Sequence, residues 1–306
     1  MNKPRAIVPW VLVLLGLSGW QPAIAQWDFL TVTGSGGVPL NVVTAGSSDD
    51  PAIVFIHGIG QSHYSFVHQL NSDLAADHFL VAFDLRGHGA SGKPWLAEDY
   101  GPGKVWADDV AAVMAATGVH RPVIVAWSYG SNVLMDYIRE YGTKGLAGIN
   151  LTGALGALKP FRLPKENPDT EAFLRLRKLR ESPDITQHIL ASEGMIQWLT
   201  EAPMSASDRQ IFQSIGLMLP AYARRAMMQR TINNQDLLDQ LTLPVLLSLG
   251  EKDNPLQLED GADLAGSHSQ IQLSVFKNAG HSIFFERPAR FNTELKKFAA
   301  TVASPR

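Results

Sequence analysis

Short runs of apolar residues alternate along this chain with longer stretches in which apolar residues recur at helical spacing. The runs Ala52–Ile56 and Phe79–Phe83 contain no polar residue, which is typical of strands covered by helices on both faces. This alternation predicts the α/β class, with a mostly parallel central sheet flanked by helices. The expected strands span residues 40–43, 52–56, 79–83, 122–126, 146–151, 244–249 and 271–276, and the main expected helices span residues 106–117, 133–141, 171–180 and 289–300. Asp108 and Asp109 would lie in the early turns of their helix, where its dipole favours anions.

The alternation stops between residues 157 and 241, where helical periods and prolines continue but no strand pattern is found. We therefore expect a core of residues 26–156 and 242–306 with a helical insertion of residues 157–241. The predicted helix 171–180 carries its basic residues on the outer face. The large apolar residues of the insertion either line a pocket or pack in a core: Met195, Trp198, Met218, Met227 and Met228.

Composition limits the classes of function. Apolar residues make up 45% of the chain and charged residues 18%, which is ordinary for a globular protein. The net charge of −3 comes without long runs of either sign, so nucleic-acid binding is not expected. The absence of cysteine excludes disulfides, thiolate nucleophiles and cysteine-ligated zinc.

The first 25 residues have the pattern of a secretory signal peptide. Lys3 and Arg5 precede an apolar run of residues 6–17, and Ala23 and Ala25 provide the small residues of a cleavage site. The alternative is an uncleaved anchor, but the run is shorter than the roughly 20 residues that a membrane-spanning helix needs. We expect cleavage after Ala25, no stable membrane span afterwards, and a periplasmic or secreted protein.

Ser128 lies where a predicted buried strand turns sharply into a helix. The local sequence is VIVAWSYGSNV, with the serine at the apex and small residues, Ala126 and Gly130, two positions to either side. Small residues are needed there because the tight turn brings the strand and helix backbones together. The A-x-S-x-G pattern differs from the commoner G-x-S-x-G by one methyl group.

Ser128 needs a base to activate it and an acid to orient that base. Asp253 follows the predicted strand 244–249, and His281 follows the predicted strand 271–276 in a Gly-His loop. The carboxyl ends of parallel strands meet at one edge of a sheet, so all three side chains should lie together. The chain order Ser, Asp, His agrees with one known arrangement of such triads.

Five signatures in this order make the chain resemble the α/β-hydrolase superfamily, specifically its serine hydrolases with a cap domain. They are HGIG at residues 57–60, DLRGHGASG at 84–92, the serine turn, GEKD at 250–253 and AGH at 279–281. The resemblance implies an oxyanion hole formed by the backbone N–H groups of Ile59 and Tyr129, and no cofactor or metal. The insertion matches the cap domain in position only. An aspartate nucleophile would have indicated a dehalogenase or an epoxide hydrolase, and Ser128 argues against both.

Three other patterns are interpreted as structural. Residues 87–93 have the spacing of a phosphate-binding loop, but Pro94 replaces the required Ser or Thr. His57, His63 and His68 have no zinc-ligand spacing. We expect Asp84 and Arg86 to brace the loops.

These observations predict hydrolysis of a small or medium ester, or a related acyl compound with an apolar acyl group, through an acyl-enzyme. Carbon-carbon bond hydrolysis, lactone opening and peracid formation on the same triad stay open as alternatives. A further alternative is a protein that captures a ligand without turnover and keeps the triad only as a vestige.

Overall fold

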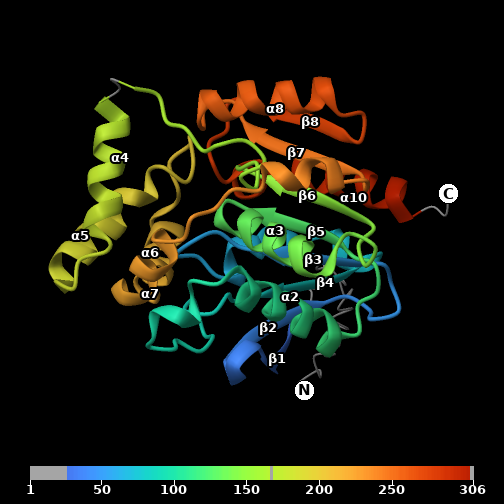
Figure 1. Cartoon of the computed structure of the whole chain (residues 1–306), viewed down its shortest axis with the longest axis horizontal. Coiled ribbons are helices and arrows are strands. Elements are labelled where there is room, and N and C mark those ends of the chain that lie inside the picture. Colours follow the sequence, from blue (N-terminus) through green and yellow to red (C-terminus); the bar gives the residue numbers. More distant parts are fainter. Residues whose placement is uncertain (1–25, 166–167, 304–306) are drawn as a thin grey trace, which may run out of the picture.

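The structure is a computed structural model that describes residues 26–165 and 168–303; the predicted signal peptide lies outside them. Eight strands form one sheet in the order β1-β2-β4-β3-β5-β6-β7-β8 (Figure 1). The pairs β1–β2 and β2–β4 are antiparallel and all the others are parallel. The predicted α/β class, with a mostly parallel sheet and flanking helices, is confirmed. The strands are β1 Asp28–Thr33, β2 Pro39–Ala45, β3 Ala52–Ile56, β4 Phe79–Phe83, β5 Val123–Trp127, β6 Gly148–Thr152, β7 Val245–Gly250 and β8 Ile271–Phe276.

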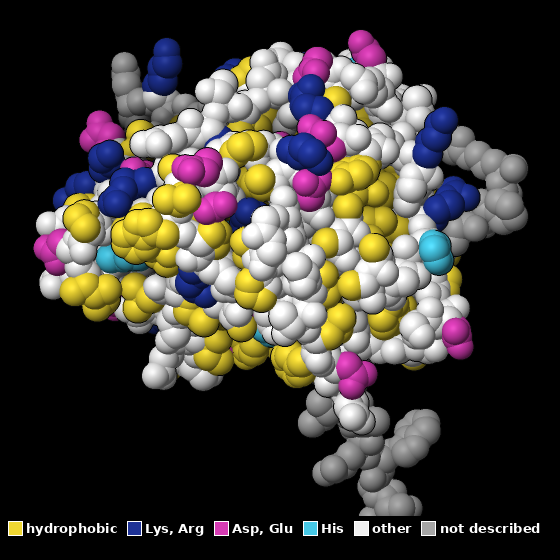
Figure 2. All heavy atoms as spheres, turned by 60° about the horizontal axis from the view of Figure 1, so that its bottom comes forward, with side chains coloured by type: hydrophobic (Ala, Val, Ile, Leu, Met, Phe, Trp, Pro, Cys, Tyr) yellow, Lys and Arg dark blue, Asp and Glu magenta, His cyan; other side chains and the backbone are white. Residues whose placement is uncertain are grey.

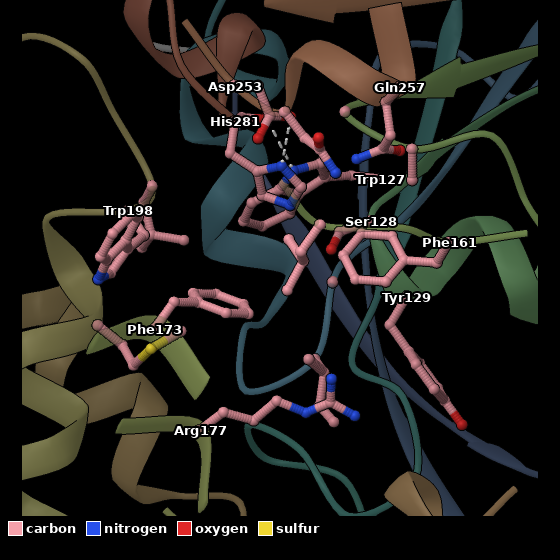
Figure 3. Close-up of a pocket in the computed structure, with 18 of the residues that line it drawn as sticks. Trp127, Ser128, Tyr129, Phe161, Phe173, Arg177, Trp198, Asp253, Gln257 and His281 are labelled. Atoms are coloured by element: carbon pink, nitrogen blue, oxygen red, sulfur yellow. Dashed lines mark hydrogen bonds and ion pairs between the residues drawn. The ribbon is translucent and has the colours of Figure 1, made fainter. Parts of the chain in front are cut away.

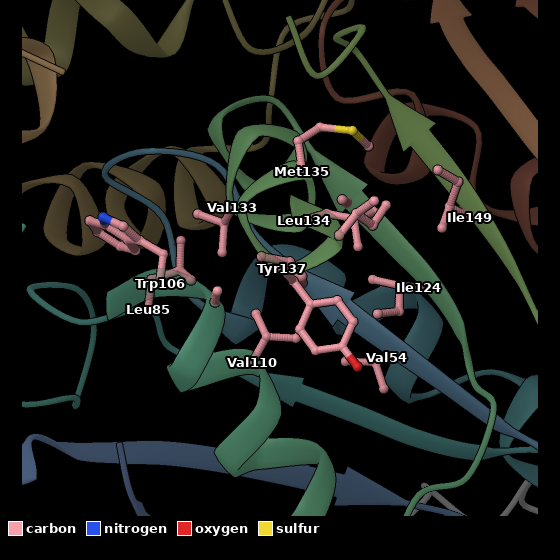
Figure 4. Packing of buried hydrophobic residues seen from close by; sticks show 14 of the residues in the cluster. Val54, Leu85, Trp106, Val110, Ile124, Val133, Leu134, Met135, Tyr137 and Ile149 are labelled. Carbon is pink, nitrogen blue, oxygen red and sulfur yellow. The ribbon is translucent and has the colours of Figure 1, made fainter. Parts of the chain in front are cut away.

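Helices cover both faces of this sheet. The α-helices are α1 Val67–Leu70, α2 Gly103–Thr117, α3 Tyr129–Tyr141, α4 Pro168–Leu179, α5 Ile185–Ile196, α6 Ala206–Leu217, α7 Ala221–Met228, α8 Pro255–Ser267, α9 Ile283–Glu286 and α10 Pro288–Ala303. Alternate residues of the central strands β3, β4 and β5 enter two separate hydrophobic clusters. Val54 and Ile124 pack with α2 and α3 in one cluster (Figure 4), and Phe55 and Val125 pack with α1, α9 and α10 in the other.

The structure corrects two details of the sequence prediction. Strand β1 had not been assigned, because its burial alternates and most of its residues are exposed. Helix α2 begins at Gly103, directly after Pro102, so Asp108 and Asp109 lie beyond its first turn. The helix dipole therefore does not explain these acids. Asp109 is instead buried and forms a two-pronged ion pair with Arg86, with distances of 2.7 and 2.8 Å.

The segment 157–241 contains α4 to α7 and a 3-10 helix, Gln235–Gln240, and no strand among its described residues. Figure 1 shows α4 to α7 grouped together at one end of the sheet. On the face shown in Figure 2, Lys and Arg side chains are interspersed with Asp and Glu. Within residues 26–165 and 168–303, no helix is both long and apolar enough to cross a bilayer.

Candidate active site

The loops that follow five neighbouring parallel strands, β3, β5, β6, β7 and β8, and the 157–241 segment surround a cavity of about 730 Å³ (Figure 3). The nucleophile candidate Ser128 follows β5 directly, while Asp253 and His281 lie in the loops after β7 and β8. All three residues line the cavity, together with Ile59 and Tyr129. The structure thus brings together every site residue that the sequence predicts.

The backbone of Ser128 is held in a strained conformation, with φ 54° and ψ −120°. Positive φ in a residue with a side chain costs about 1–3 kcal/mol and persists only where neighbouring contacts enforce it. The Ser128 N–H donates to Thr152 O at 3.0 Å, and the N–H of Ser131 donates to Ser128 O at 3.0 Å. Gly130 is required because a Cβ there would strike the carbonyl oxygens of Ile56 and His57. Ala126 is fully buried in register with Ile56, so the turn accommodates its extra methyl group.

His281 and Asp253, the predicted base and acid, form a hydrogen-bonded pair. The His281 Nδ1 lies 2.8 Å from Asp253 Oδ2. Burial alone lowers the pKa of His281, but the charge and hydrogen bond of Asp253 outweigh burial, and the pKa ends above its ordinary value. Ser128 Oγ and His281 line the same cavity but do not form a hydrogen bond with each other in this structure. Such hydrogen bonds commonly tighten only when substrate binds.

The loop after β3 turns the Gly58 carbonyl toward the buried His57 side chain. The carbonyl oxygen of Gly58 accepts hydrogen bonds from Gln61 N–H at 3.2 Å and from His57 Nδ1 at 2.7 Å. Because the peptide is planar and trans, the Ile59 N–H points opposite to that carbonyl, and Ile59 lines the cavity. The Tyr129 N–H begins helix α3, where backbone donors are unpaired and the dipole favours an anion. Both groups are suited to bind an oxyanion.

His57 maintains this loop as a neutral side chain. Its Nδ1 donates to Gly58 O, and its Nε2 accepts from the Leu85 N–H at 3.0 Å, which fixes one neutral tautomer. Burial is the main cause that lowers the pKa of His57 to about 4. The ring therefore stays uncharged at neutral pH and serves the loop architecture.

Asp84 braces the neighbouring loop, as the sequence analysis expected. Its carboxylate accepts the His63 N–H at 2.7 Å and the Ala90 N–H at 2.8 Å, and it pairs with His63 Nδ1 at 2.8 Å. Burial would raise the pKa of Asp84, but the contacts with His63 prevail and lower it to about 2. In the described part of the chain, no group of three or more His, Cys, Asp or Glu side chains could hold a metal ion.

The 157–241 segment supplies most of the apolar wall of the cavity. Of the five large apolar residues that the sequence left open between pocket and core, Met218 is outside the lining and 42% exposed. The other four line the cavity with three phenylalanines of the same segment: Met195, Trp198, Met227, Met228, Phe161, Phe173 and Phe212.

One prediction about this segment holds only in part. The bases of helix 171–180 were expected on its outer face, and Arg175 and Lys178 are exposed there. Arg180 is instead buried, and Arg177 and Arg180 both line the cavity. Figure 3 shows Arg177 extending from α4 toward the cavity. Arg224 of α7 is also buried against the cavity, and sequence reasoning did not identify it. Glu286 was missed as well, although its carboxylate accepts the Gly280 N–H, next to His281, at 2.7 Å.

Known proteins resemble this chain over most of its length. The profile of the Alpha/beta hydrolase family matches residues 53–294. The AB hydrolase superfamily protein YisY of Bacillus subtilis (strain 168) is 27% identical over 260 residues, which cover 81% of this chain and 91% of YisY. Protein ABHD8 of Homo sapiens is 26% identical over 260 residues, 83% of this chain but only 56% of ABHD8. The solved structure of esterase RhEst1 from Rhodococcus sp. ECU1013 superposes with a TM-score of 0.79 at 29% identity, covering 90% of this chain and 99% of that one.

Proposed function

Because the chain belongs to the alpha/beta hydrolase family, we propose that it is a serine hydrolase that cleaves small or medium esters through Ser128, His281 and Asp253. One observation carries the proposal. The strained Ser128 and the His281–Asp253 pair open onto the same cavity, beside two backbone N–H groups suited to an oxyanion. The similarity to esterase RhEst1 supports ester hydrolysis as the reaction class.

The reaction would begin with attack of Ser128 Oγ on the ester carbonyl carbon. Neutral His281 takes the Ser128 proton on Nε2, and Asp253 stabilises the resulting imidazolium through Nδ1. The negative charge on the former carbonyl oxygen is stabilised by the N–H groups of Ile59 and Tyr129, each worth roughly 3 kcal/mol in the transition state.

Collapse of this intermediate expels the alcohol, which receives the proton from His281, and leaves an ester between the acyl group and Ser128 Oγ. Water then attacks that ester, with His281 again as base, and releases the carboxylic acid and free Ser128. The reaction therefore consumes only the ester and water, and it regenerates Ser128 and neutral His281.

The substrate would be held beneath the 157–241 segment, which we propose acts as a cap. Support comes from the apolar wall that Trp198, Phe173 and the three lining methionines form over the cavity. Such a wall fits an apolar acyl or alcohol group.

Hydrolysis of p-nitrophenyl esters from acetate to octanoate by the protein and by Ser128→Ala tests the proposal. The assay is run near pH 7.5, above the ordinary histidine pKa of about 6.5. We expect the wild-type protein to hydrolyse these esters and Ser128→Ala to have no turnover. The dependence of the wild-type rate on acyl-chain length would show how long an acyl group the apolar wall accommodates. Equal turnover in both proteins, or none in either, would reject the esterase proposal.

The same triad serves carbon-carbon bond hydrolases, lactonases and perhydrolases, so these reactions are assayed in parallel. A dienoic ring-cleavage product and a set of lactones are supplied beside the esters. A ligand-capture protein would instead bind with no significant turnover of any of them.

We also propose that the enzyme acts in the periplasm or outside the cell, on the basis of the signal-peptide pattern in residues 1–25. Sequencing the N-terminus of the protein recovered from a bacterial periplasm tests this. A mature protein that begins at Gln26 would support export, and a retained Met1 in the cytoplasm would contradict it.

A further inference from the structure

Two buried arginines of the 157–241 segment form no ion pair with any described residue. Arg180 follows α4 and is 7% exposed, and Arg224 lies in α7 and is 3% exposed. The Nε atoms of both, and Nη2 of Arg224, are buried without a hydrogen-bond partner. Arginines at such burial normally pair with a carboxylate, as Arg86 does with Asp109 in this protein.

The two guanidinium groups converge on one point of the site. A Cβ built on Gly60 would lie 2.5 Å from Arg180 Nη2 and 2.7 Å from Arg224 Nη2. Gly60 follows Ile59, whose N–H is proposed to bind the oxyanion. A Cβ on Gly58, only about 7 Å of backbone away, would lie 3.5 Å from Ser128 Oγ. The arginines therefore lie against the same loop as Ser128, two residues further along it, and both line the cavity with Ser128.

Further polar groups at the same place also lack partners. His188 Nε2 and Ser192 Oγ, both on α5, are buried without a hydrogen bond. Burial, then the charges of Arg224 and Arg180, lower the pKa of His188 to about 4.

The lowered pKa values of the two arginines are consistent with a site that an anion would stabilise. Burial is the sole cause that lowers the pKa of Arg180, to about 10. Burial and then Arg180 lower the pKa of Arg224, against a smaller opposing influence of Glu181. Glu181 itself pairs with Lys178, at 3.6 Å. Arg177 adds a third positive charge to this side of the cavity.

We infer that Arg180 and Arg224 form a subsite for a carboxylate of the substrate, so that the preferred esters carry a free acid group besides the ester bond. This inference rests on the proposed function for the reaction and on the unpartnered arginines for the substrate class. Guanidinium groups match a carboxylate with paired, charge-assisted hydrogen bonds. The apolar wall would then contact the rest of the substrate.

A matched pair of substrates tests the inference: mono-p-nitrophenyl glutarate and its methyl ester, which differ in the free carboxylate. The wild-type protein should have the higher kcat/KM for the acid. In Arg180→Met and Arg224→Met the preference should fall about 10- to 100-fold, the value of a lost charge-assisted hydrogen bond, with little change for the methyl ester. Arg175→Met removes an exposed arginine of α4 and should keep the wild-type preference.

Two further measurements keep the test decisive. Arg224→Lys retains the charge but not the planar fork, so it should lose part of the preference even if Arg224→Met does not fold. Free glutarate should raise the melting temperature of Ser128→Ala but not that of Ser128→Ala carrying Arg180→Met. This binding readout holds even if no ester is hydrolysed, so it separates failure of the subsite from failure of the proposed reaction. A wild-type protein without preference for the acid, or variants that retain it, would overturn the inference.

Discussion

The indole Nε1 of Trp127 donates a hydrogen bond to the backbone carbonyl of His281 at 3.0 Å. The residue before the nucleophile candidate thereby holds the loop of the base candidate, although 154 positions separate them in the chain. The Trp127 ring also packs against the His281 ring, with centroids 5.6 Å apart, and is 1% exposed. Trp127 thus links the strand that precedes Ser128 to the loop that carries His281.

Trp127→Phe should remove the hydrogen bond while keeping an aromatic ring in the core. The unpaired His281 carbonyl would cost about 1–3 kcal/mol of stability. We expect a lower melting temperature, and a kcat for p-nitrophenyl acetate that falls more than KM changes. Trp95→Phe, at a residue 74% exposed, is the control. An unchanged kcat in Trp127→Phe would show that the contact does not position His281.

The pH dependence of activity should reflect the raised pKa of His281. The base works only when neutral, so kcat/KM should fall as the pH drops through that pKa. Because Asp253 raises the pKa, the midpoint should lie above the ordinary histidine value of about 6.5.

Asp253→Asn removes the carboxylate charge that raises the pKa of His281. We expect the acid limb of the pH profile to move to lower pH, and kcat to fall by several powers of ten, because the tautomer of His281 is no longer fixed. Asp49→Asn, at an exposed position in the loop after β2, should change neither the pH profile nor kcat. An acid limb at the same pH in Asp253→Asn would exclude His281 as the titrating group.

The buried pair of Arg86 and Asp109 should matter for folding and not for chemistry. Asp109→Ala leaves the buried Arg86 guanidinium without its partner, which should lower the free energy of unfolding by about 3–5 kcal/mol. Lys104→Met breaks the exposed pair with Asp108 on the same helix and should cost less than about 1 kcal/mol. Urea denaturation of both variants compares them, and equal midpoints would contradict this view of the buried pair.

The sequence predicted the fold well because its core strands are continuous apolar runs. Ala52–Ile56 and Val123–Trp127 are buried at every position and are too short for a buried helix. Ser128 directly follows such a strand, and Asp253 follows the wholly buried β7. His281 was found from its Gly-His loop after β8, in which only Ile271 and Phe276 are buried. The exposed edge strand β1 gave no such signal.

The residues that the sequence did not reveal depend on contacts between distant segments. Arg180 ends an amphipathic helix whose bases were assigned to solvent, and only the packing of α4 and α7 over Gly60 shows that it is buried. Glu286 occupies a four-residue helix, and two of its hydrogen-bond donors are more than 80 residues away. No local pattern encodes either contact.

Glu286 joins the His281 loop to the 157–241 segment. Its carboxylate accepts the N–H groups of Gly280 at 2.7 Å, Glu201 at 2.9 Å and Ala202 at 3.2 Å. A second link lies beside it, where the Ser282 N–H donates to Leu199 O at 2.8 Å. The position of the base candidate and the position of the proposed cap are therefore coupled through the Glu286 carboxylate and through this second hydrogen bond.

Glu286→Gln should weaken this coupling, because an amide NH₂ cannot accept the N–H groups that the second carboxylate oxygen accepts. Losing such bonds should speed amide exchange at residues 201–202 or at residue 280 roughly tenfold or more. Since the same loop carries His281, kcat should fall as well, and the chain-length preference should broaden as the wall near Trp198 loosens. Glu140→Gln, at an exposed position of α3, is the matched control. Faster amide exchange with an unchanged kcat and an unchanged chain-length preference would mean that Glu286 holds residues 201–202 in place but does not position His281.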